Sequence, residues 1–318
     1  MKKRILAICN VIGCLLVMFL FSGSAAAASI QLYGLSVTPA LEQLTIASGQ
    51  QTASFSCAIT NNTNATLDLT MTAQDFTALN NTGGVSFLTN SSPSNSNGLA
   101  DWIKFGVHTA VLPAHSSQVI PVTIVNAVNL APGGHYAALK FTAAMPNSTT
   151  STNRILTQEV VTTLLFVIAS GHAVQTIKLE PLQQSWLSLH IPSNAYLVFS
   201  NAGNTQTAPR GLVTIESPFH SEVARGIVNA GSGLVLPATS RLYNVPLRAE
   251  GSFNFPGIYT VIVHYGPNGT PSTQTITKHF LYINEPLFIA VVVMIIIAIL
   301  WLLRRYGLRQ IYIMRHKA

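Results

Sequence analysis

Charged side chains are scarce in this chain. Asp, Glu, Lys and Arg make up 8% of its 318 residues, and its net charge of +7 lies at its two ends. The cations of these flanks are Lys2, Lys3 and Arg4 at the start, and Arg304, Arg305, Arg309, Arg315 and Lys317 at the end. Between the flanks, nine Lys and Arg face all ten Asp and Glu, so the middle is nearly neutral. No basic surface remains for phosphate contacts, and we expect no nucleic-acid partner.

Catalytic motifs are missing as well. The three aspartates, Asp68, Asp75 and Asp101, are scattered and form no D-T/S-G dyad. The sequence has no G-x-S-x-G, H-E-x-x-H, Walker loop or Cys/His zinc spacing. The glycines of "NAGSGLV", Gly231 and Gly233, lack a third partner and are interpreted as a turn. We therefore expect no catalytic residue, no cofactor and no metal ligand.

Cysteine is almost absent. Of three cysteines, Cys9 and Cys14 lie in the N-terminal segment and Cys57 stands alone in the rest. A single thiol cannot form an internal disulfide. Because it lies in the alternating segment "TASFSCAIT", we interpret Cys57 as a buried strand residue rather than a nucleophile.

The N-terminus is typical of a secretory signal. A cationic start, an apolar stretch over 5–21 and "SGSAAAAS" predict a signal peptide over 1–28, cleaved near Ala27 or Ala28. Two alternatives remain open. One is an uncleaved N-terminal anchor, and the other is lipidation at Cys14, the end of the lipobox-like "VIGC". Against lipidation, the residues that follow Cys14 stay apolar.

The C-terminus predicts a membrane anchor. Residues 287–303 form a run of seventeen without a charge, which is near the lower limit for crossing a hydrocarbon layer of about 30 Å. We expect a transmembrane helix over 286–303 and a basic cytoplasmic tail over 304–318. Because positive charge stays on the cytoplasmic side, the five terminal cations orient the chain with its C-terminus inside. The predicted location is the cell membrane, with the other domains on the extracellular or periplasmic side.

Helical periodicity is nearly absent between these ends. Residues 29–285 instead show short alternating segments rich in Val, Ile, Thr, Phe and Tyr, separated by Gly, Pro, Asn and Ser. Examples are "TASFSCAIT", "TLDLTMTA", "QVIPVTIV", "YAALKF", "VVTTLLFVIA", "AYLVFS", "GLVTIE" and "YTVIVHYG". Many short strands between turns predict an all-β protein built of antiparallel sandwiches.

Two passages repeat. "VLPAHSSQVIPV" and "VLPATSRLYNVPL" share the motif V-L-P-A-x-S. Each is followed by a Pro-Gly turn into a strand. The landmarks are Pro113 with Pro132 and Pro237 with Pro256, nineteen residues apart in both copies. We interpret this as a duplication at a distance of about 124 residues, although two unrelated sandwiches could share so short a motif. It predicts two tandem immunoglobulin-like sandwiches over 29–171 and 172–285.

A tyrosine follows the Pro-Gly turn of each copy. Tyr136 and Tyr259 stand near the start of their strands, and Tyr259 shares one face with Val261, Val263 and Tyr265. We interpret these tyrosines as core and corner residues. Trp102 and Trp186 could stack on sugars, but isolated aromatics on strands are more often core.

Two polar segments are typical of loops. "TNSSPSNSNG" at 89–98 and "MPNSTTSTN" at 145–153 are small, polar and nearly uncharged. They are either binding loops or flexible connections.

The motifs also resemble a group of bacterial surface proteins. "LSVTPALEQLTIASGQ", "TNNTNAT", the "DF" at Asp75 and Phe76, "VLPAHSSQVIPVTIV" and "PGGHYAALKF" are similar to WxL-interacting proteins, and equally to PapD-like and NEW3-like immunoglobulin modules. The plan of signal, two sandwiches, membrane helix and basic tail is similar too. The WxL resemblance implies a first domain associated with peptidoglycan and a second with a surface protein. "DWIKFG" at 101–106 departs from the pattern.

The sequence thus predicts a non-catalytic, single-pass membrane protein whose sandwiches bind a cell-wall glycan or another surface protein. The alternative is an accessory subunit, sensor or chaperone of a membrane complex.

Overall fold

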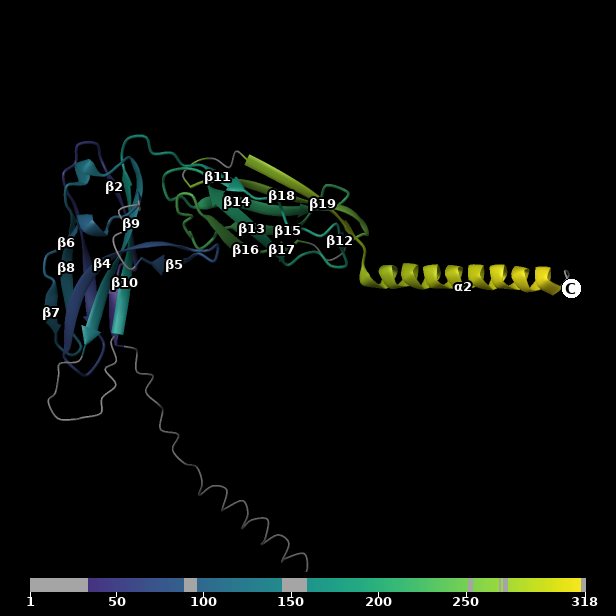
Figure 1. Ribbon diagram of the computed structural model, residues 1–318, viewed down its shortest axis with the longest axis horizontal. Helices are drawn as coiled ribbons and strands as arrows, with labels where there is room; N and C mark the ends of the chain where they lie inside the picture. Colours follow the sequence, from purple (N-terminus) through teal and green to yellow (C-terminus); the bar gives the residue numbers. More distant parts are fainter. Residues whose placement is uncertain are drawn as a thin grey trace, which may run out of the picture.

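The computed structural model describes residues 34–88, 96–144, 159–250, 254–268, 270 and 274–315, with side chains as far as Arg305. The signal peptide with Cys14, residue Lys317 and most of the two polar loops lie outside the described residues, as do the side chains of Arg309 and Arg315. Two β-sandwiches follow one another at a bend, and a long helix leaves the far end of the second (Figure 1).

The first sandwich packs two sheets face to face. One sheet has the spatial order β1 (Leu35–Thr38), β3 (Ala53–Asn61), β8 (Ser117–Ile124), β6 (Ile103–Phe105). The other has the order β2 (Leu41–Ile46), β10 (Glu159–Ala169), β9 (Gly133–Ala144), β4 (Leu67–Leu79), β5 (Gly84–Phe87), with β7 (Thr109–Leu112) also paired to β4. Short 3-10 turns, η1 (Ala100–Trp102) and η2 (Ala127–Asn129), lie in its connections.

The second sandwich has a smaller and a larger sheet. The smaller has the order β11 (Ile177–Leu179), β13 (Asn194–Asn201), β16 (Ser240–Pro246). The larger has the order β12 (Leu187–Ser188), β19 (Gln274–Tyr282), β18 (Gly257–Pro267), β14 (Pro209–Glu216), β15 (Glu222–Val228), β17 (Arg248–Ala249).

Both sandwiches follow one plan. In each, the first two strands belong to different sheets. In the first sandwich, β1 pairs antiparallel with β3 in one sheet, and β2 pairs parallel with the last strand, β10, in the other. The second sandwich does the same with β11 on β13 and β12 on β19. The all-β class with two tandem immunoglobulin-like sandwiches and one C-terminal apolar helix is therefore confirmed.

The alternating segments place apolar residues inside, as their period of two requires. Cys57 is fully buried in β3, which confirms its interpretation as a buried strand residue, and burial raises the pKa of its thiol. Tyr259, Val261, Val263 and Tyr265 are all buried on one face of β18, as predicted.

An asparagine closes the same turn in both sandwiches. The Asn61 side chain donates to the carbonyls of Ala65 and Leu112 at 2.8 and 3.1 Å. Asn201 donates in the same way to Thr205 and Val235 at 2.7 and 3.0 Å. Each asparagine is buried, so its amide joins the turn after one strand to the turn that precedes another.

The proline landmarks all stand in turns before strands. Pro113 and Pro237 precede β8 and β16, and Pro132 and Pro256 precede β9 and β18. In the turn that contains Pro113 or Pro237, however, the residue with left-handed backbone is His115 in one copy and Ala238 in the other, 123 residues apart. The structural repeat is therefore shifted by one residue from the alignment of the V-L-P-A motifs.

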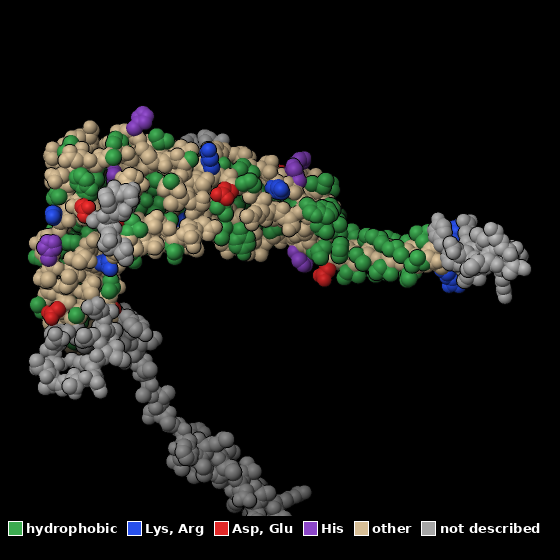
Figure 2. Space-filling view, in the orientation of Figure 1, with side chains coloured by type: hydrophobic (Ala, Val, Ile, Leu, Met, Phe, Trp, Pro, Cys, Tyr) green, Lys and Arg blue, Asp and Glu red, His purple; other side chains and the backbone are tan. Residues whose placement is uncertain are grey.

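Helix α2 (Glu285–Arg315) is longer than expected. Residues 285–305 are long and apolar enough to cross a membrane, and none of that window is buried in the protein. The helix does not end at Leu303, so the expected tail is helical as far as Arg315. Figure 2 shows the hydrophobic surface along α2 and the few charged side chains on the visible face of the sandwiches.

Replacing Asn61 by Ala should lower the free energy of unfolding of the first sandwich by roughly 2–4 kcal/mol, because it leaves buried carbonyls without donors. Urea denaturation of the full chain in detergent measures this effect. Asn62→Ala is the matched control, because Asn62 makes one long side-chain bond of 3.4 Å to Ser36 at the surface. Equal losses for both variants would contradict the role assigned to Asn61.

Candidate functional site: the groove between the sandwiches

An apolar contact joins the two sandwiches. Phe76, Tyr136 and Phe166 lie on the outer face of the larger sheet of the first sandwich, and Leu236 of the second packs against them. The ring centroids of Phe76 and Tyr136 are 5.0 Å apart, and those of Phe76 and Phe166 are 5.8 Å apart. Tyr136 is therefore buried as predicted, but at the joint between domains rather than in one sandwich core.

Hydrogen bonds brace this joint at two places. The Gly134 amide donates to the Asn204 carbonyl at 2.8 Å, and the Asn204 side chain donates to the carbonyl of Pro132 at 3.3 Å. On the other side, the Leu242 amide of β16 donates to the Asn81 carbonyl at 2.7 Å, in the turn between β4 and β5. Figure 1 shows the β4–β5 hairpin reaching across to the second sandwich.

Two adjoining cavities lie beside the joint. The first, of about 220 Å³, has Leu41, Val85 and Leu164 of the first sandwich on one wall and residues 231–236 and 239–241 of the second on the other. The second, of about 290 Å³, runs along β15 and β16. Because Gly231, Gly233 and Arg241 line both, we treat the two cavities together as the groove.

Residues 229–236, the joint loop, form the wall shared by the joint and the groove. Asn229 is left-handed and fixes the loop, since its side chain donates to the Gly233 carbonyl and accepts from the Gly233 amide at 2.9 and 2.7 Å. Two arginines hold it from outside. Arg210 donates to the carbonyl of Asn229 at 3.0 Å, and Arg241 donates to that of Leu234 at 3.0 Å. The predicted turn at Gly231 is present and forms part of the site.

Arg241 stands at the centre of the groove. Its guanidinium lies close to Gly83 of the first sandwich and Gly233 of the second, where a Cβ atom would approach within 2.4 and 2.7 Å of its carbon. It also lies 5.3 Å from the ring centre of Tyr243, a cation–π distance. In the part of the chain that the structure describes, ion pairs are limited to Glu216 with His220 and Glu222 with Arg225. The Arg241 charge has no carboxylate partner there.

Tyr136 of the joint and Tyr243 of the second sandwich keep their protons to high pH. Burial raises the pKa of Tyr136 to about 12, and the charge of Asp75 adds to this. Burial also raises the pKa of Tyr243 to about 12, although the Arg241 guanidinium acts in the opposite direction. Asp75 is itself buried and accepts bonds from the amides of Leu99 and Ala100, both at 2.9 Å.

The groove offers several kinds of contact to a ligand. The wall of the first cavity is mostly apolar, whereas the second cavity, lined by the second sandwich alone, mixes apolar side chains with Asn229 and Asn244. The charged group of the groove is the Arg241 guanidinium, and edge strand β16 supplies backbone groups. Among the described residues, no group of three His, Cys, Asp or Glu could hold a metal ion. Such a site fits an extended peptide whose apolar side chains enter the walls and whose carboxylate meets Arg241.

Sequence reasoning found little of this site. The landmarks Pro113, Pro237 and Pro256 and the core residue Tyr259 do not line the groove. Trp186 does not line it either and directly precedes β12, which lies at the end of the second sandwich nearest α2 (Figure 1). Arg210 and Arg241 were not singled out, although an arginine in a region with so few charges is itself a signal.

Comparison with solved structures finds similar proteins at low sequence identity. The class 5 fimbriae chaperone CfaA has a TM-score of 0.42 at 13% identity, over 78% of this chain and 99% of the other. The E. coli chaperone DraB has a TM-score of 0.38 at 12% identity, over 79% and 98%. A PapD-like domain of human CEP192 has a TM-score of 0.28 at 9% identity, over 43% and 85%. No protein-family model matches the sequence, and no curated protein matches it.

The raised tyrosine pKa values predict a loss of stability at high pH. Between pH 10 and pH 12 the unfolded chain loses the phenolic protons of Tyr136 and Tyr243 while the folded chain keeps them, so stability falls as pH rises through this window. We expect Tyr136→Phe to reduce that fall by roughly 1–3 kcal/mol. Urea denaturation at both ends of the window measures it. An unchanged pH slope in Tyr136→Phe would contradict the assignment.

The joint contact predicts a specific effect of shortening Leu236. We expect Leu236→Ala to weaken the joint by roughly 2–4 kcal/mol, because it opens a void against Phe76 and Phe166. The two sandwiches should then unfold in separate calorimetric transitions. Ile227→Ala, which truncates an exposed side chain of the same sandwich, is the control. A single unchanged transition in Leu236→Ala would show that the joint does not couple the domains.

Proposed function

We propose that this protein is a non-catalytic, membrane-anchored accessory protein that holds an extended segment of another exported protein in the groove. The observation that carries the proposal is Arg241, a guanidinium between apolar walls with no carboxylate partner among the described residues. A peptide carboxylate would supply that partner, and a bidentate guanidinium–carboxylate pair would fix the position of the segment.

Strand β16 supports a peptide as the ligand. It is an edge strand of its sheet, and among the described residues no strand pairs with its outer side, where the Leu242 amide donates to the Asn81 carbonyl. An extended segment can add to such an edge, taking affinity from its backbone and selectivity from pockets for alternate side chains. The exposed side chain of Leu242 lies on this strand and lines the second cavity.

Anchoring rests on α2. Residues 285–305 span about 32 Å as a helix, which matches a bilayer core. Arg304 and Arg305 follow the apolar run with exposed side chains, and the Arg305 guanidinium lies 5.2 Å from the Trp301 ring centre. Under the positive-inside rule this end is cytoplasmic, and the sandwiches stand outside.

A cell-wall glycan has less support as the ligand. Sugar sites commonly stack rings on exposed aromatic faces. In the groove, Phe76 and Phe166 are packed in the joint, and Arg241 covers the ring of Tyr243. The narrower resemblance to WxL-interacting proteins, with its peptidoglycan role, stays a prediction.

Site-specific crosslinking in the cells that make the protein tests the proposal. A photoreactive phenylalanine at Leu242, in the groove, should capture an exported protein, and adding Arg241→Ala should reduce the yield about tenfold if the carboxylate pair contributes about 1.4 kcal/mol. The same probe at Val119, an exposed position of the first sandwich, should capture none. Equal capture at both positions, or a glycan adduct at Leu242, would contradict the proposal.

A further inference from the structure

Four large apolar side chains are exposed at the end of the second sandwich that adjoins α2. Trp186, Phe219, Phe255 and Ile258 are 72%, 73%, 57% and 62% exposed. We call these four residues the aromatic rim. Large exposed apolar groups gathered at one place commonly mark a contact surface.

The pairing of β18 with β19 brings the rim together. Ile258 lies opposite Leu281 near the end of β19, and the Leu281 amide donates to the Trp186 carbonyl at 2.6 Å. The Phe219 and Phe255 rings meet edge to face with centroids 6.1 Å apart. All four residues therefore lie within a few residues of the point where the sheet ends.

The sheet continues almost directly into the helix. β19 ends at Tyr282 and α2 begins at Glu285. The Ile283 amide still donates to Ser188 at 3.1 Å, and Asn284 already accepts the Phe288 amide at 3.0 Å. Two intervening residues span at most about 7 Å. The rim is thus held within a short distance of the first turn of the apolar span.

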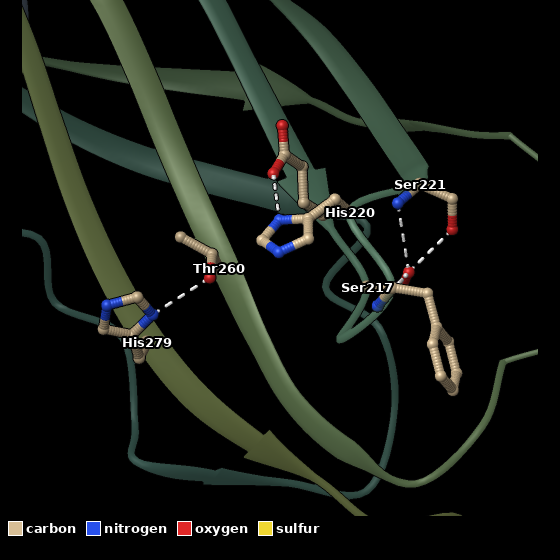
Figure 3. Close-up of polar contacts among 7 residues, drawn as sticks. Ser217, His220, Ser221, Thr260 and His279 are labelled. Atoms are coloured by element: carbon tan, nitrogen blue, oxygen red, sulfur yellow. Dashed lines mark hydrogen bonds and ion pairs between the residues drawn. The ribbon is translucent and has the colours of Figure 1, made fainter.

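The turn that carries Phe219 is firmly braced. Ser217 and Ser221 are joined through their hydroxyls at 2.6 Å, and the Ser217 hydroxyl also accepts the Phe219 amide at 3.2 Å (Figure 3). His220 is left-handed and lies 3.7 Å from Glu216. Beside the turn, Thr260 and His279 pair at 2.9 Å across β18 and β19. A fixed turn presents its aromatic ring without a large cost in conformational entropy.

Charge near the rim is mixed in sign. Glu222 pairs with Arg225 at 2.6 Å, and Glu216 on β14 and Lys278 on β19 lie on the two strands that flank β18. No cationic cluster among the described residues here would require anionic lipid. The attraction that the rim can offer is apolar and aromatic.

We propose that the aromatic rim inserts into the outer headgroup layer of the membrane crossed by α2, so that the second sandwich stands directly on the bilayer. This inference rests on the membrane anchoring in the proposed function. Tryptophan and other aromatic rings favour that layer, and the short tether brings the rim to it. The lipid surface thereby fixes the height at which the groove stands.

Fluorescence quenching in reconstituted full-length protein tests this inference. The chain has three tryptophans, so pairs of Trp→Phe substitutions leave Trp102, Trp186 or Trp301 alone. The probe is a phosphatidylcholine bilayer that carries a nitroxide on its headgroups. We expect quenching of Trp301 in α2 and of Trp186 in the rim, and none of Trp102 in the first sandwich. Added anionic lipid should leave the quenching of Trp186 unchanged.

Variants of the rim give the second measurement. Phe219→Ser with Phe255→Ser should remove most of the Trp186 quenching, whereas Val119→Ala in the first sandwich should leave it intact. Both phenylalanines are exposed, so these changes spare the core.

The outcomes separate the two proposals. Quenching of Trp301 without quenching of Trp186 would overturn the rim inference and leave the anchor standing. Loss of both would overturn the anchor and the inference together. Protection of Trp186 in native membranes but not in pure lipid would assign the rim to a protein partner instead.

Discussion

Packing of Leu236 against Phe76, Tyr136 and Phe166 sets the position of one sandwich relative to the other. The larger sheet of the first sandwich would otherwise expose these large rings to water on its outer face. Covering that face therefore favours one arrangement of the domains. The hydrogen bonds of the Asn204 side chain with Pro132 and of the Leu242 amide with Asn81 form only in that arrangement. The groove is a by-product of this joint, because its walls belong to both domains.

The scarcity of charge gives Arg241 its importance. In a surface rich in carboxylates, a guanidinium in a cleft would find a partner from its own chain. Here the described residues leave it between two glycines, where the absence of side chains makes room for it. Its hydrogen bond to Leu234 ties it to the same loop that carries Leu236. The residue that would bind a ligand is therefore linked to the residue that joins the domains.

The sequence predicted the strands well and the joint poorly. Alternation in segments such as "YTVIVHYG" reports which side chains face inward, and every quoted segment forms a strand. Tyr136 shows the limit of that signal, since alternation cannot tell a sandwich core from a face covered by another domain. The site depends on residues far apart in the chain, such as Gly83, Gly233 and Arg241, which only the folded pairing of two domains brings together. The extension of α2 beyond Leu303 was missed because charge ends a membrane span without ending a helix.

The central claim is that the two sandwiches form one body with a groove of fixed shape. Pulsed electron spin resonance between labels at Val119→Cys and Ile227→Cys, in full-length protein in lipid nanodiscs, measures it directly. Both positions are exposed and lie on different sandwiches. Cys57 is buried and does not compete for the label, and Cys9 and Cys14 of the predicted signal peptide are replaced by Ser. The account predicts one narrow distance distribution that broadens in Leu236→Ala. A broad distribution in the unaltered joint would contradict it, because independent sandwiches cannot hold a groove between them.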